Sequence, residues 1–450
     1  MDLFGSSGVR GVAPGELTPE LVLRVARATG TIFEAERVAL GRDTRETGRL
    51  LVGAAASGLA AAGSDVDRLG VVPTPSLQAY CERESVPGVV ITASHNPPEY
   101  NGVKLVAADG VELSNERLEA VESRLDDAGY ATWDRTGSIR SVENANRAYN
   151  RELLAALDRE AIADADLRVV IDPGHGAGAL TSPELFRELG VEVRTIHAQP
   201  DGHFPGRDPE PVAENLTDLG RLVAAADADL GIAHDGDADR AMFFDETGAF
   251  VEGDAVLAAL AAAELRAGDV AVSAVNASQR LVDVVEAADA ELRLTPIGST
   301  YITTAIRELR ADGRSVPIAG EGNGGILFPA YRIARDGAYT AGRLCELLAA
   351  REASLGELIA PYDEYHNVRH NVAYDDSAER AAMLEAIDAA AEVADGTVDR
   401  TDGCRIGYDD GWVLARPSGT EPLVRVYAEA RDPDRAAALA AGMRDRLAAV

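Results

Sequence analysis

Residues 87–96 have the sequence PGVVITASHN, a short apolar run rich in β-branched residues that ends abruptly in a polar turn before two prolines. Such a run indicates a buried strand followed by a loop, because proline and small polar residues do not continue a strand. The same order of strand and polar loop recurs in LGIAHDGD at 230–237 and in VPIAGEGN at 316–323. We therefore predict an α/β fold with three similar domains, each giving one loop to a shared central cleft.

The rest of the chain fits this plan, with a smaller α+β lid domain at the carboxy-terminal end. Thr18 followed by Pro19 predicts a helix start, and Gly63 predicts a helix end. Residues 168–179 indicate the strand that opens the second domain, since they lack the full glycine pattern of a dinucleotide site. A turn at 409–411 joins strands of the last domain. The predicted domains are 1–146, 147–249, 250–358 and 359–450.

One lysine stands among 43 basic residues, at position 104, where it ends the stretch TASHNPPEYNGVK. Arginine keeps its proton near neutrality, whereas a lysine shifts its pKa readily when buried and then acts as an acid or a base. Drift in a lysine-poor composition is the alternative, since it would leave a last lysine anywhere in the chain. We favour a requirement for a transferable proton at Lys104, because chance would place the last lysine in this stretch only about one time in thirty-five.

Ser94 and His95 lie where the first of the three strands ends. A serine in this place is a nucleophile, a cap or an ordinary turn residue, and its local sequence alone favours the turn. The neighbouring histidine is equally ambiguous. The interpretation of both residues therefore depends on what the other loops contribute.

The second loop carries carboxylates at Asp235, Asp237 and Asp239. Alternate residues of an extended loop point the same way, so these side chains converge where a small hard cation such as Mg²⁺ binds. A solvated acidic loop is the alternative in a chain so rich in acid. Gly236 and Ala238 allow close approach, and the loop lacks the glutamate and the spacing of a calcium-binding EF-hand. We therefore predict a magnesium site.

The third and fourth loops have the side chains of a ligand-binding site rather than of a catalyst. Glu321 and Asn323 are the side chains of hydrogen-bonding length in the glycine-rich stretch at 318–327, which suits a polyhydroxylated ligand. Residues 414–426, LARPSGTEPLVRV, combine arginine, hydroxyl and backbone amide donors in a compact turn that suits an anion. The residues of this predicted anion site are Arg416, Ser418, Gly419 and Thr420, with Arg425 nearby.

Taken in order, TASHNPPEYNGVK, DGDADR, GEGNGG and RPSGTEP resemble the four signatures of the α-D-phosphohexomutase family, and FGSSGVRG at 4–11 resembles its amino-terminal loop. The resemblance spans nearly the whole chain. It implies that Ser94, with His95 beside it, is the serine that carries phosphate in the resting enzyme. It also implies that Asp235, Asp237 and Asp239 hold Mg²⁺ together with the phosphoserine, that Arg240 closes that loop, and that Lys104 and Arg10 lie near the transferring phosphate. The contacts with the sugar that it implies are those of Gly298, Thr300, Glu321 and Asn323. The implied contacts with the other phosphate are those of Arg416, Ser418, Gly419 and Thr420.

The resemblance further implies a mutase that converts a hexose 6-phosphate into the 1-phosphate through a phosphoserine enzyme and a sugar 1,6-bisphosphate, which also acts as activator. Such a relay requires a nucleophile, a cation, a proton shuttle and a distal grip. Glucosamine 6-phosphate is the expected substrate because FGSSGVRG and the chain length resemble phosphoglucosamine mutases, with mannose and glucose phosphates as alternatives. Asn323 and Gly325 depart from the commonest family pattern, GEXSGH, which leaves the choice of hexose open.

Two other classes of function use some of the same residues. A phosphosugar hydrolase would employ Ser94 and the acidic loop, but it has little use for a grip on a second phosphate. A catalytically silent phosphosugar sensor would be expected to have lost Ser94, Lys104 or an acidic ligand, and the sequence retains all of them. Both classes are therefore less favoured than a mutase.

The net charge of −32 comes from acidic residues spread through the chain, which indicates a solvated surface. With so little lysine, this composition resembles that of proteins from salt-accumulating halophiles, in which salt screens self-repulsion. It argues against nucleic acid as a partner and leaves a small phosphosugar. No stretch is apolar enough to span a membrane and no signal peptide is evident, so we expect a cytoplasmic protein. Cys81, Cys345 and Cys404 are expected to be buried free thiols, and no feature predicts the oligomeric state.

Overall fold

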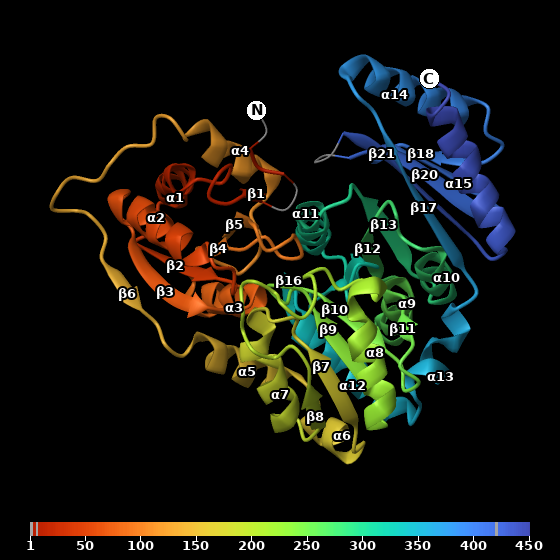
Figure 1. The fold of residues 1–450 in the computed structure, drawn as a ribbon, viewed down its shortest axis with the longest axis horizontal. Coiled ribbons are helices and arrows are strands. Elements are labelled where there is room, and N and C mark those ends of the chain that lie inside the picture. The colour runs from red at the N-terminus through yellow and green to blue at the C-terminus, as the bar shows by residue number, and fades with distance from the viewer. Residues whose placement is uncertain (1–2, 6–7, 419–421) are drawn as a thin grey trace.

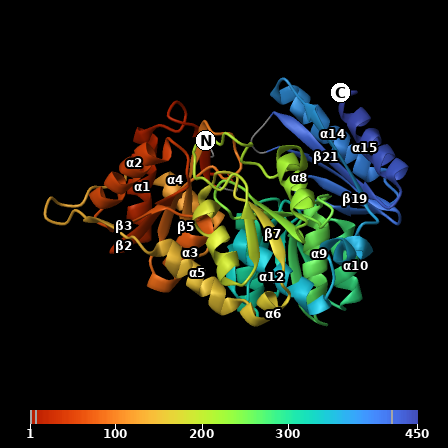
Figure 2. The ribbon, with the colours of Figure 1, turned by 60° about the horizontal axis from the view of Figure 1, so that its bottom comes forward.

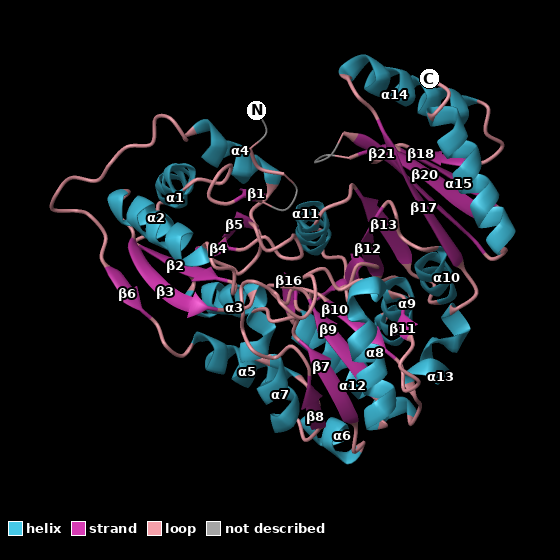
Figure 3. Cartoon of the chain, in the orientation of Figure 1, coloured by secondary structure: helices cyan, strands magenta, loops and turns pink. Residues whose placement is uncertain are grey.

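Four β-sheets with helices packed against them follow one another along the chain in the computed structural model, which describes residues 3–5, 8–418 and 422–450 (Figure 1). The first sheet lies at one side of the molecule, the second and third lie in the middle, and the fourth lies at the other side. The view in Figure 2 shows the same arrangement after a turn of 60°. Colouring by secondary structure shows helices beside every sheet (Figure 3).

The first domain begins with the helix boundaries that its sequence predicts. The hydroxyl oxygen of Thr18 accepts a hydrogen bond from the amide of Leu21 at 3.1 Å, and Pro19 stands at the first helical position. Gly63, with a φ of 102°, follows the next helix, so both predicted boundaries are confirmed. The elements are β1 (Val9–Val12), α1 (Pro19–Phe33), β2 (Arg37–Arg42), α2 (Gly48–Ala61), β3 (Asp65–Val71), α3 (Thr74–Glu84), β4 (Gly88–Ile91), β5 (Tyr100–Val106), α4 (Asn115–Ser123) and β6 (Ile139–Ser141).

The second and third domains contain the strands that carry the acidic loop and the glycine-rich loop. The second comprises α5 (Ala145–Ala156), α6 (Arg159–Asp164), β7 (Arg168–Asp172), η1 (Ala177–Leu180), α7 (Ser182–Glu188), β8 (Glu192–Thr195), η2 (Ala213–Leu216), α8 (Thr217–Ala226), β9 (Leu230–His234), β10 (Ala241–Phe244) and β11 (Phe250–Val251). The third comprises α9 (Gly253–Glu264), β12 (Val270–Ala274), α10 (Gln279–Ala287), β13 (Glu291–Thr295), α11 (Ser299–Ala311), β14 (Ala319–Glu321), β15 (Gly325–Phe328), β16 (Arg332–Arg335), α12 (Gly337–Arg351), α13 (Leu355–Ile359) and η3 (Ala360–Tyr362).

The first three sheets share one strand order. The orders are β3-β2-β4-β5-β1, β8-β7-β9-β10-β11 and β13-β12-β14-β15-β16, with β6 added beyond β3. In each sheet a central strand, β2, β7 or β12, pairs in parallel with both neighbours, and the third strand then pairs antiparallel with the next one along the chain. The prediction of three α/β domains on one plan is therefore confirmed.

The shared topology places the three predicted loops at equivalent positions. Residues 92–99 join β4 to β5, residues 235–240 join β9 to β10, and residues 322–324 join β14 to β15. Each loop therefore leaves the carboxyl end of a parallel strand, which is where ligands bind in α/β sheets.

The fourth domain is an antiparallel sheet covered by two helices, as expected for a smaller α+β domain. Met383, Ile387 and Met443 on those helices pack against the strands in one core. Its strand order is β17-β21-β20-β19-β18. The elements are β17 (His366–Ala373), α14 (Ser377–Glu392), β18 (Thr397–Asp399), β19 (Cys404–Tyr408), β20 (Gly411–Pro417), β21 (Leu423–Ala430) and α15 (Pro433–Leu447).

The hydrophobic cores divide the molecule unequally. The second and third domains share one large core, which includes Phe186 from α7 and Leu344 from α12, whereas the first and fourth domains have cores of their own. A small cluster of Val275, Trp412 and Leu414 packs the fourth domain against the third. Buried polar contacts add to this interface, since Glu429 Oε1 accepts a hydrogen bond from the Gln279 amide at 2.6 Å and Arg405 Nη1 donates to the Val275 carbonyl at 2.9 Å.

Two further expectations concern the cysteines and membrane helices. Cys81, Cys345 and Cys404 are buried free thiols, as predicted. Among the helices in the described part of the chain, none has the length and apolar composition that crossing a lipid bilayer requires.

Candidate active site

The first and second loops meet through a hydrogen bond between Ser94 and Asp235. The Ser94 hydroxyl donates to Asp235 Oδ2 at 2.6 Å, and both residues are fully buried. Ser94 has a φ of 52°, a left-handed conformation that residues other than glycine rarely adopt. The structure therefore places the predicted nucleophile against the predicted metal loop, across a domain boundary.

The three aspartates converge, although the loop that carries them is not extended. Residues 235–240 form a tight turn in which the Ala238 amide donates to the Asp235 carbonyl at 3.2 Å, and Ala238 has a φ of 55°. The prediction of an extended loop is wrong, because this turn is what gathers the side chains. One carboxylate oxygen from each of Asp235, Asp237 and Asp239 lies within 4.8 Å of the others, and all three residues are buried.

Cations from two other segments pair with these carboxylates. Lys104 Nζ donates to Asp237 Oδ2 and to Asp239 Oδ2, each at 3.0 Å. Arg335 Nη2 donates to Asp239 Oδ2 at 2.6 Å, and Thr74 Oγ1 donates to Asp237 Oδ2 at 2.6 Å. The Oδ2 atoms of Asp237 and Asp239 are thus occupied by donors from the first and third domains.

The other oxygens of the same carboxylates are suited to a metal ion. Asp237 Oδ1 and Asp239 Oδ1 are buried and accept no hydrogen bond within the described residues, and Arg240 Nε lies 3.8 Å from Asp239 Oδ1. Buried carboxylate oxygens without donors carry a desolvation cost that a cation removes. Mg²⁺ prefers hard oxygen ligands of this kind, so the residues present fit the ion.

The electrostatic setting separates the three acids. Burial and the charges of Asp237 and Asp239 raise the pKa of Asp235 to about 8. Burial opposes ionisation of Asp239 as well, but Arg335 and Lys104 outweigh it and lower the pKa of Asp239. Asp235 is therefore the one acid of the three whose charge lacks sufficient compensation.

The environment of Lys104 keeps its amine protonated. Burial disfavours the charge, but the carboxylates of Asp237 and Asp239 outweigh burial and raise the pKa of Lys104 above its ordinary value. A protonated amine donates a proton or neutralises phosphate, and it is not a free base. The sequence left the choice between acid and base open, and this setting favours the acid.

Arg10 and His95 contact the loop that carries Ser94. Arg10 Nη1 donates to Asn96 Oδ1 at 2.6 Å, which ties β1 to the serine loop. His95 Nδ1 lies 3.3 Å from Ser94 Oγ. The positive charge of Arg240, together with burial, lowers the pKa of His95, so the ring is neutral. A neutral imidazole accepts or donates a hydrogen bond without adding charge to the site.

The third loop is hydrogen-bonded to the strand that follows the metal loop. The Ala241 amide donates to the Gly324 carbonyl at 3.1 Å, and Glu321 is buried at 6% exposure. A Cβ atom at Gly325 would stand 2.6 Å from Arg335 Cδ. The Arg335 side chain therefore occupies the space that a larger residue at position 325 would need, which accounts for the glycine.

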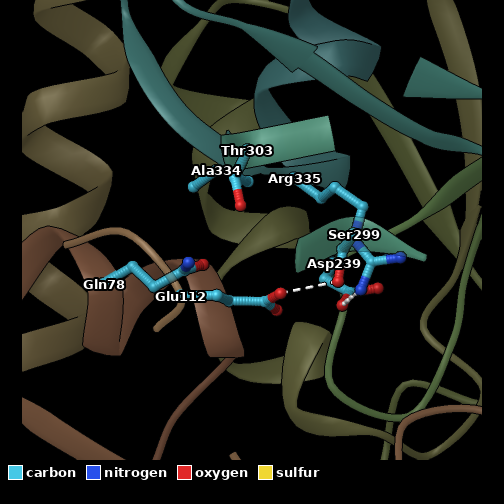
Figure 4. Close-up of a pocket in the computed structure, with 7 residues that line it drawn as sticks. All are labelled: Gln78, Glu112, Asp239, Ser299, Thr303, Ala334 and Arg335. Atoms are coloured by element: carbon cyan, nitrogen blue, oxygen red, sulfur yellow. Dashed lines mark hydrogen bonds and ion pairs between the residues drawn. The ribbon is translucent and has the colours of Figure 1, made fainter. Parts of the chain in front are cut away.

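A carboxylate that sequence reasoning missed, Glu112, joins the first domain to the start of α11. Ser299 Oγ donates to Glu112 Oε2 at 2.6 Å, and Figure 4 shows both side chains beside Asp239 and Arg335. A small pocket here is lined by Gln78, Glu112, Asp239, Ser299, Thr303, Ala334 and Arg335. A second small pocket is lined by Gly8, Lys104, Leu105, Glu112, Leu113, Leu118 and Thr300, so Thr300 and Lys104 line one space. Gly298, with a φ of 136°, precedes α11.

The predicted anion site in the fourth domain stands apart from this cluster. Arg416 forms an ion pair with Asp402 at 3.0 Å, and Asp402 also accepts a hydrogen bond from the Ile297 amide at 3.1 Å. Arg416 and Arg425 are cross-strand partners on β20 and β21. The Ser418 amide donates to the Leu423 carbonyl at 2.8 Å. Gly419 and Thr420 lie outside the described residues.

Models of known protein families match nearly the whole chain. Three models, described as phosphoglucomutase/phosphomannomutase alpha/beta/alpha domains I, II and III, match residues 1–131, 147–248 and 252–365. A fourth, described as the phosphoglucomutase/phosphomannomutase C-terminal domain, matches residues 370–446.

Individual relatives show the same likeness over their full length. The chain is 40% identical over 444 residues to a phosphoglucomutase/phosphomannomutase of Thermococcus kodakarensis, covering 96% of each protein. It is 42% identical over 438 residues to a probable phosphoglucosamine mutase of Methanopyrus kandleri, covering 96% of this chain and 95% of that one. A solved structure of a family protein from Burkholderia thailandensis superposes with a TM-score of 0.86 at 29% identity, covering 100% of this chain and 97% of that one. The likeness therefore extends across all four domains.

Proposed function

Because the chain belongs to the phosphoglucomutase/phosphomannomutase family and is thus a phosphohexomutase, we propose that it converts a hexose 6-phosphate into the 1-phosphate through a phosphoserine at Ser94. The observation that carries the proposal is the hydrogen bond of 2.6 Å from Ser94 Oγ to Asp235 Oδ2. It brings a buried hydroxyl to a buried cluster of carboxylates from another domain. A nucleophile beside a cation site is what phosphoryl transfer requires.

The reaction is a relay of two transfers. Phosphoserine gives its phosphoryl group to the free hydroxyl of the sugar phosphate, so the Ser94 Oγ–P bond breaks and a sugar O–P bond forms. The resulting 1,6-bisphosphate then turns over in the cleft, and Ser94 Oγ takes the phosphoryl group from the other end. One hexose phosphate leaves and the phosphoserine is restored, so a free bisphosphate serves as activator of an enzyme that has lost its phosphate.

Proton transfer in this relay falls to Lys104. Its ammonium gives a proton to Ser94 Oγ as the Oγ–P bond breaks, and the proton released by the sugar hydroxyl restores the ammonium. The raised pKa of Lys104 supports this direction, because the residue begins the step protonated.

Asp235, Asp237, Asp239 and the phosphoserine would hold Mg²⁺. The ion would supply positive charge that offsets the charge of the phosphoryl group. Arg10 and Arg240, which flank the serine and metal loops, would provide further donors to the phosphoryl oxygens.

Substrate binding is assigned to the third and fourth domains. We assign contacts with the sugar to Gly298, Thr300, Glu321 and Asn323. The phosphate that is not transferred would be gripped by Arg416, Ser418, Gly419 and Thr420, with Arg425 nearby. A grip of this kind has to release and rebind an intermediate that presents either end, and the separate core of the fourth domain supports movement of that domain as a unit.

We propose glucosamine 6-phosphate as the preferred substrate, with mannose and glucose phosphates as alternatives. The likeness to the probable phosphoglucosamine mutase of M. kandleri supports the first, and the likeness to the T. kodakarensis protein supports the alternatives. The test is a comparison of kcat/KM for the 6-phosphates of glucosamine, N-acetylglucosamine, mannose and glucose, each primed with its 1,6-bisphosphate. Formation of 1-phosphate by enzyme whose Ser94 has first been dephosphorylated, only when the primer is present, supports the relay. Release of inorganic phosphate without 1-phosphate would contradict a mutase.

A further inference from the structure

Arg45, which lies between β2 and α2, holds the serine loop through its guanidinium group. The residue is fully buried, and its Nε donates to Asp43 Oδ2 at 3.0 Å. The remaining four N–H groups reach backbone carbonyls of the segment that joins β4 to β5 and of the first residue of β5. These carbonyls belong to Ser94 at 2.8 Å, Asn96 at 2.6 Å, Pro97 at 2.5 Å and Tyr100 at 2.9 Å.

A second chain of hydrogen bonds joins the ion pair of Arg45 and Asp43 to the Ser94 amide. Asp43 Oδ2 accepts from Thr92 Oγ1 at 2.7 Å, and Thr92 Oγ1 accepts from the Ser94 amide at 3.0 Å. Arg45 holds the Ser94 carbonyl directly. Both peptide groups that flank the Ser94 side chain are therefore fixed by one buried ion pair.

Such support is needed because of the backbone conformation of Ser94. A serine with a φ of 52° persists only when its surroundings impose that conformation. In this conformation Ser94 Oγ reaches Asp235 Oδ2. A change in the path of the loop would move the oxygen away from the carboxylates.

The second domain packs against Arg45 and against the backbone of Ser94. The ring centroid of Phe204 lies 5.2 Å from Arg45 Cζ. A Cβ atom at Gly236, in the metal loop, would stand 2.6 Å from the Ser94 carbonyl oxygen and 3.6 Å from the Phe204 ring. Arg45 thus holds the serine loop at the surface where it meets the metal loop.

We propose that Arg45 is a positioning residue for phosphoryl transfer, which sets the place of Ser94 Oγ relative to the metal-binding carboxylates. Its donors are all engaged by protein groups, so it acts through the loop and not on substrate. The inference rests on the proposed function, in which Ser94 carries the phosphoryl group.

The test is the conservative substitution Arg45→Lys, which keeps the positive charge but offers one nitrogen where four carbonyls are spread over seven residues. We expect kcat to fall about 10²-fold with KM changed less than about threefold, because a displacement of about 1 Å at a reacting atom has an effect of this size. Phosphorylation of Ser94 by hexose 1,6-bisphosphate, followed by intact mass, should slow by the same factor.

Arg27→Lys is the matched control. Arg27 is a buried arginine of the same domain, at 8% exposure, and its guanidinium packs on Tyr130, away from the serine loop. This variant carries the same burial of a lysine and should keep the wild-type kcat. An equal loss of kcat in both variants would attribute the effect to general destabilisation and overturn the proposal.

Thr92→Val is a second variant for the case in which Arg45→Lys does not fold. It removes the hydroxyl between Asp43 and the Ser94 amide with little change of shape, and we expect kcat to fall about tenfold, since one of several supports is lost. A folded Arg45→Lys or Thr92→Val enzyme with wild-type kcat would refute the positioning role. A wild-type protein without mutase activity would instead refute the proposed function.

Discussion

The two halves of the cleft are built differently. In the half between the first and second domains, Ser94, Asp237 and Lys104 are at most 3% exposed and are joined to partners at 2.6–3.0 Å. In the fourth domain, the Arg416 side chain is 15% exposed and its partner Asp402 is 18% exposed. The comparison teaches that the groups proposed for bond making are buried and paired across a domain boundary, whereas the charged groups of the proposed grip are partly exposed.

The physical basis of the difference is the way each half is anchored. Ser94 and the aspartates lie at the ends of buried strands and are tied to each other across a domain boundary. The fourth domain instead has its own core and meets the third through a small apolar cluster and through the hydrogen bonds of Glu429 and Arg405. In the proposed relay the grip has to let go of the bisphosphate while the reacting groups stay in place, and a domain with its own core can move as a unit.

The largest effect is expected from removing the nucleophile. Ser94→Ala should abolish turnover, and purified wild-type protein should carry one phosphoryl group at Ser94, because the proposed relay passes through Ser94 Oγ, the hydroxyl that reaches Asp235 Oδ2. Intact-mass and peptide analysis measures the phosphate. Ser57→Ala, on the exposed face of α2, is the control and should keep full activity. An active enzyme with unmodified Ser94 would show that the buried half of the cleft does not carry the phosphoryl group on this serine.

Removing one acid should reduce activity without reducing stability. Asp235→Asn should lower kcat about 10³-fold, since a metal ligand is lost. Because the pKa of Asp235 is raised to about 8, its charge is disfavoured in the fold, so the metal-free variant should be at least as stable as the wild type at pH 9. Thermal unfolding in chelator tests this, with Asp237→Asn as the contrast. That variant should be less stable, because Asp237 pairs with Lys104. Full activity of chelated wild-type enzyme would exclude the metal role.

Changing the lone lysine should have the next largest effect. Lys104→Arg keeps the charge but not a transferable proton, so kcat should fall about 10²-fold while KM changes little. Steady-state kinetics decide the matter. A variant that retains most of its kcat would show that position 104 requires charge alone.

A substitution in the proposed phosphate grip should change KM and not kcat. Arg416→Ala should raise KM about tenfold, as expected for a lost hydrogen bond to a charged group, while kcat stays within about twofold. A fall in kcat with constant KM would mean that the fourth domain takes part in bond making, and the contrast between the two halves would fail.

The smallest effect is expected at the junction of the third and fourth domains. Asp254 in α9 lies against Gly322 of the glycine-rich loop. Burial, followed by the charge of Glu429, raises the pKa of Asp254 to about 7. The charges of Arg369 and Arg280 oppose this rise, and the charge of Glu252 adds to it. Asp254 binds its proton more tightly in the folded state, so its contribution to stability is complete below about pH 4 and is lost as the pH rises through about 7. Asp254→Asn should remove this pH dependence of unfolding with little change in kcat. An unchanged profile would contradict the assignment.

The sequence predicted the parts of the site that local pattern determines. Ser94 and Asp235 each follow a short apolar run, and an apolar run that ends in glycine or proline reveals a strand and its loop. Arg335 and Glu112 escaped notice because their roles come from partners far away in the chain: Arg335 lies 96 residues from Asp239, and Glu112 lies 187 residues from Ser299. Their own surroundings in sequence carry no motif, so only the folded arrangement reveals them.

The burial of the single lysine makes the molecule unusually inert to amine chemistry. Lys104 is 3% exposed and paired with two carboxylates, so its side chain offers acylating or alkylating reagents almost no nucleophilic nitrogen. Reagents that label most proteins at many surface lysines should therefore leave the Lys104 side chain unmodified while the first and second domains stay together. The rate at which Lys104 is modified then measures how often those domains separate.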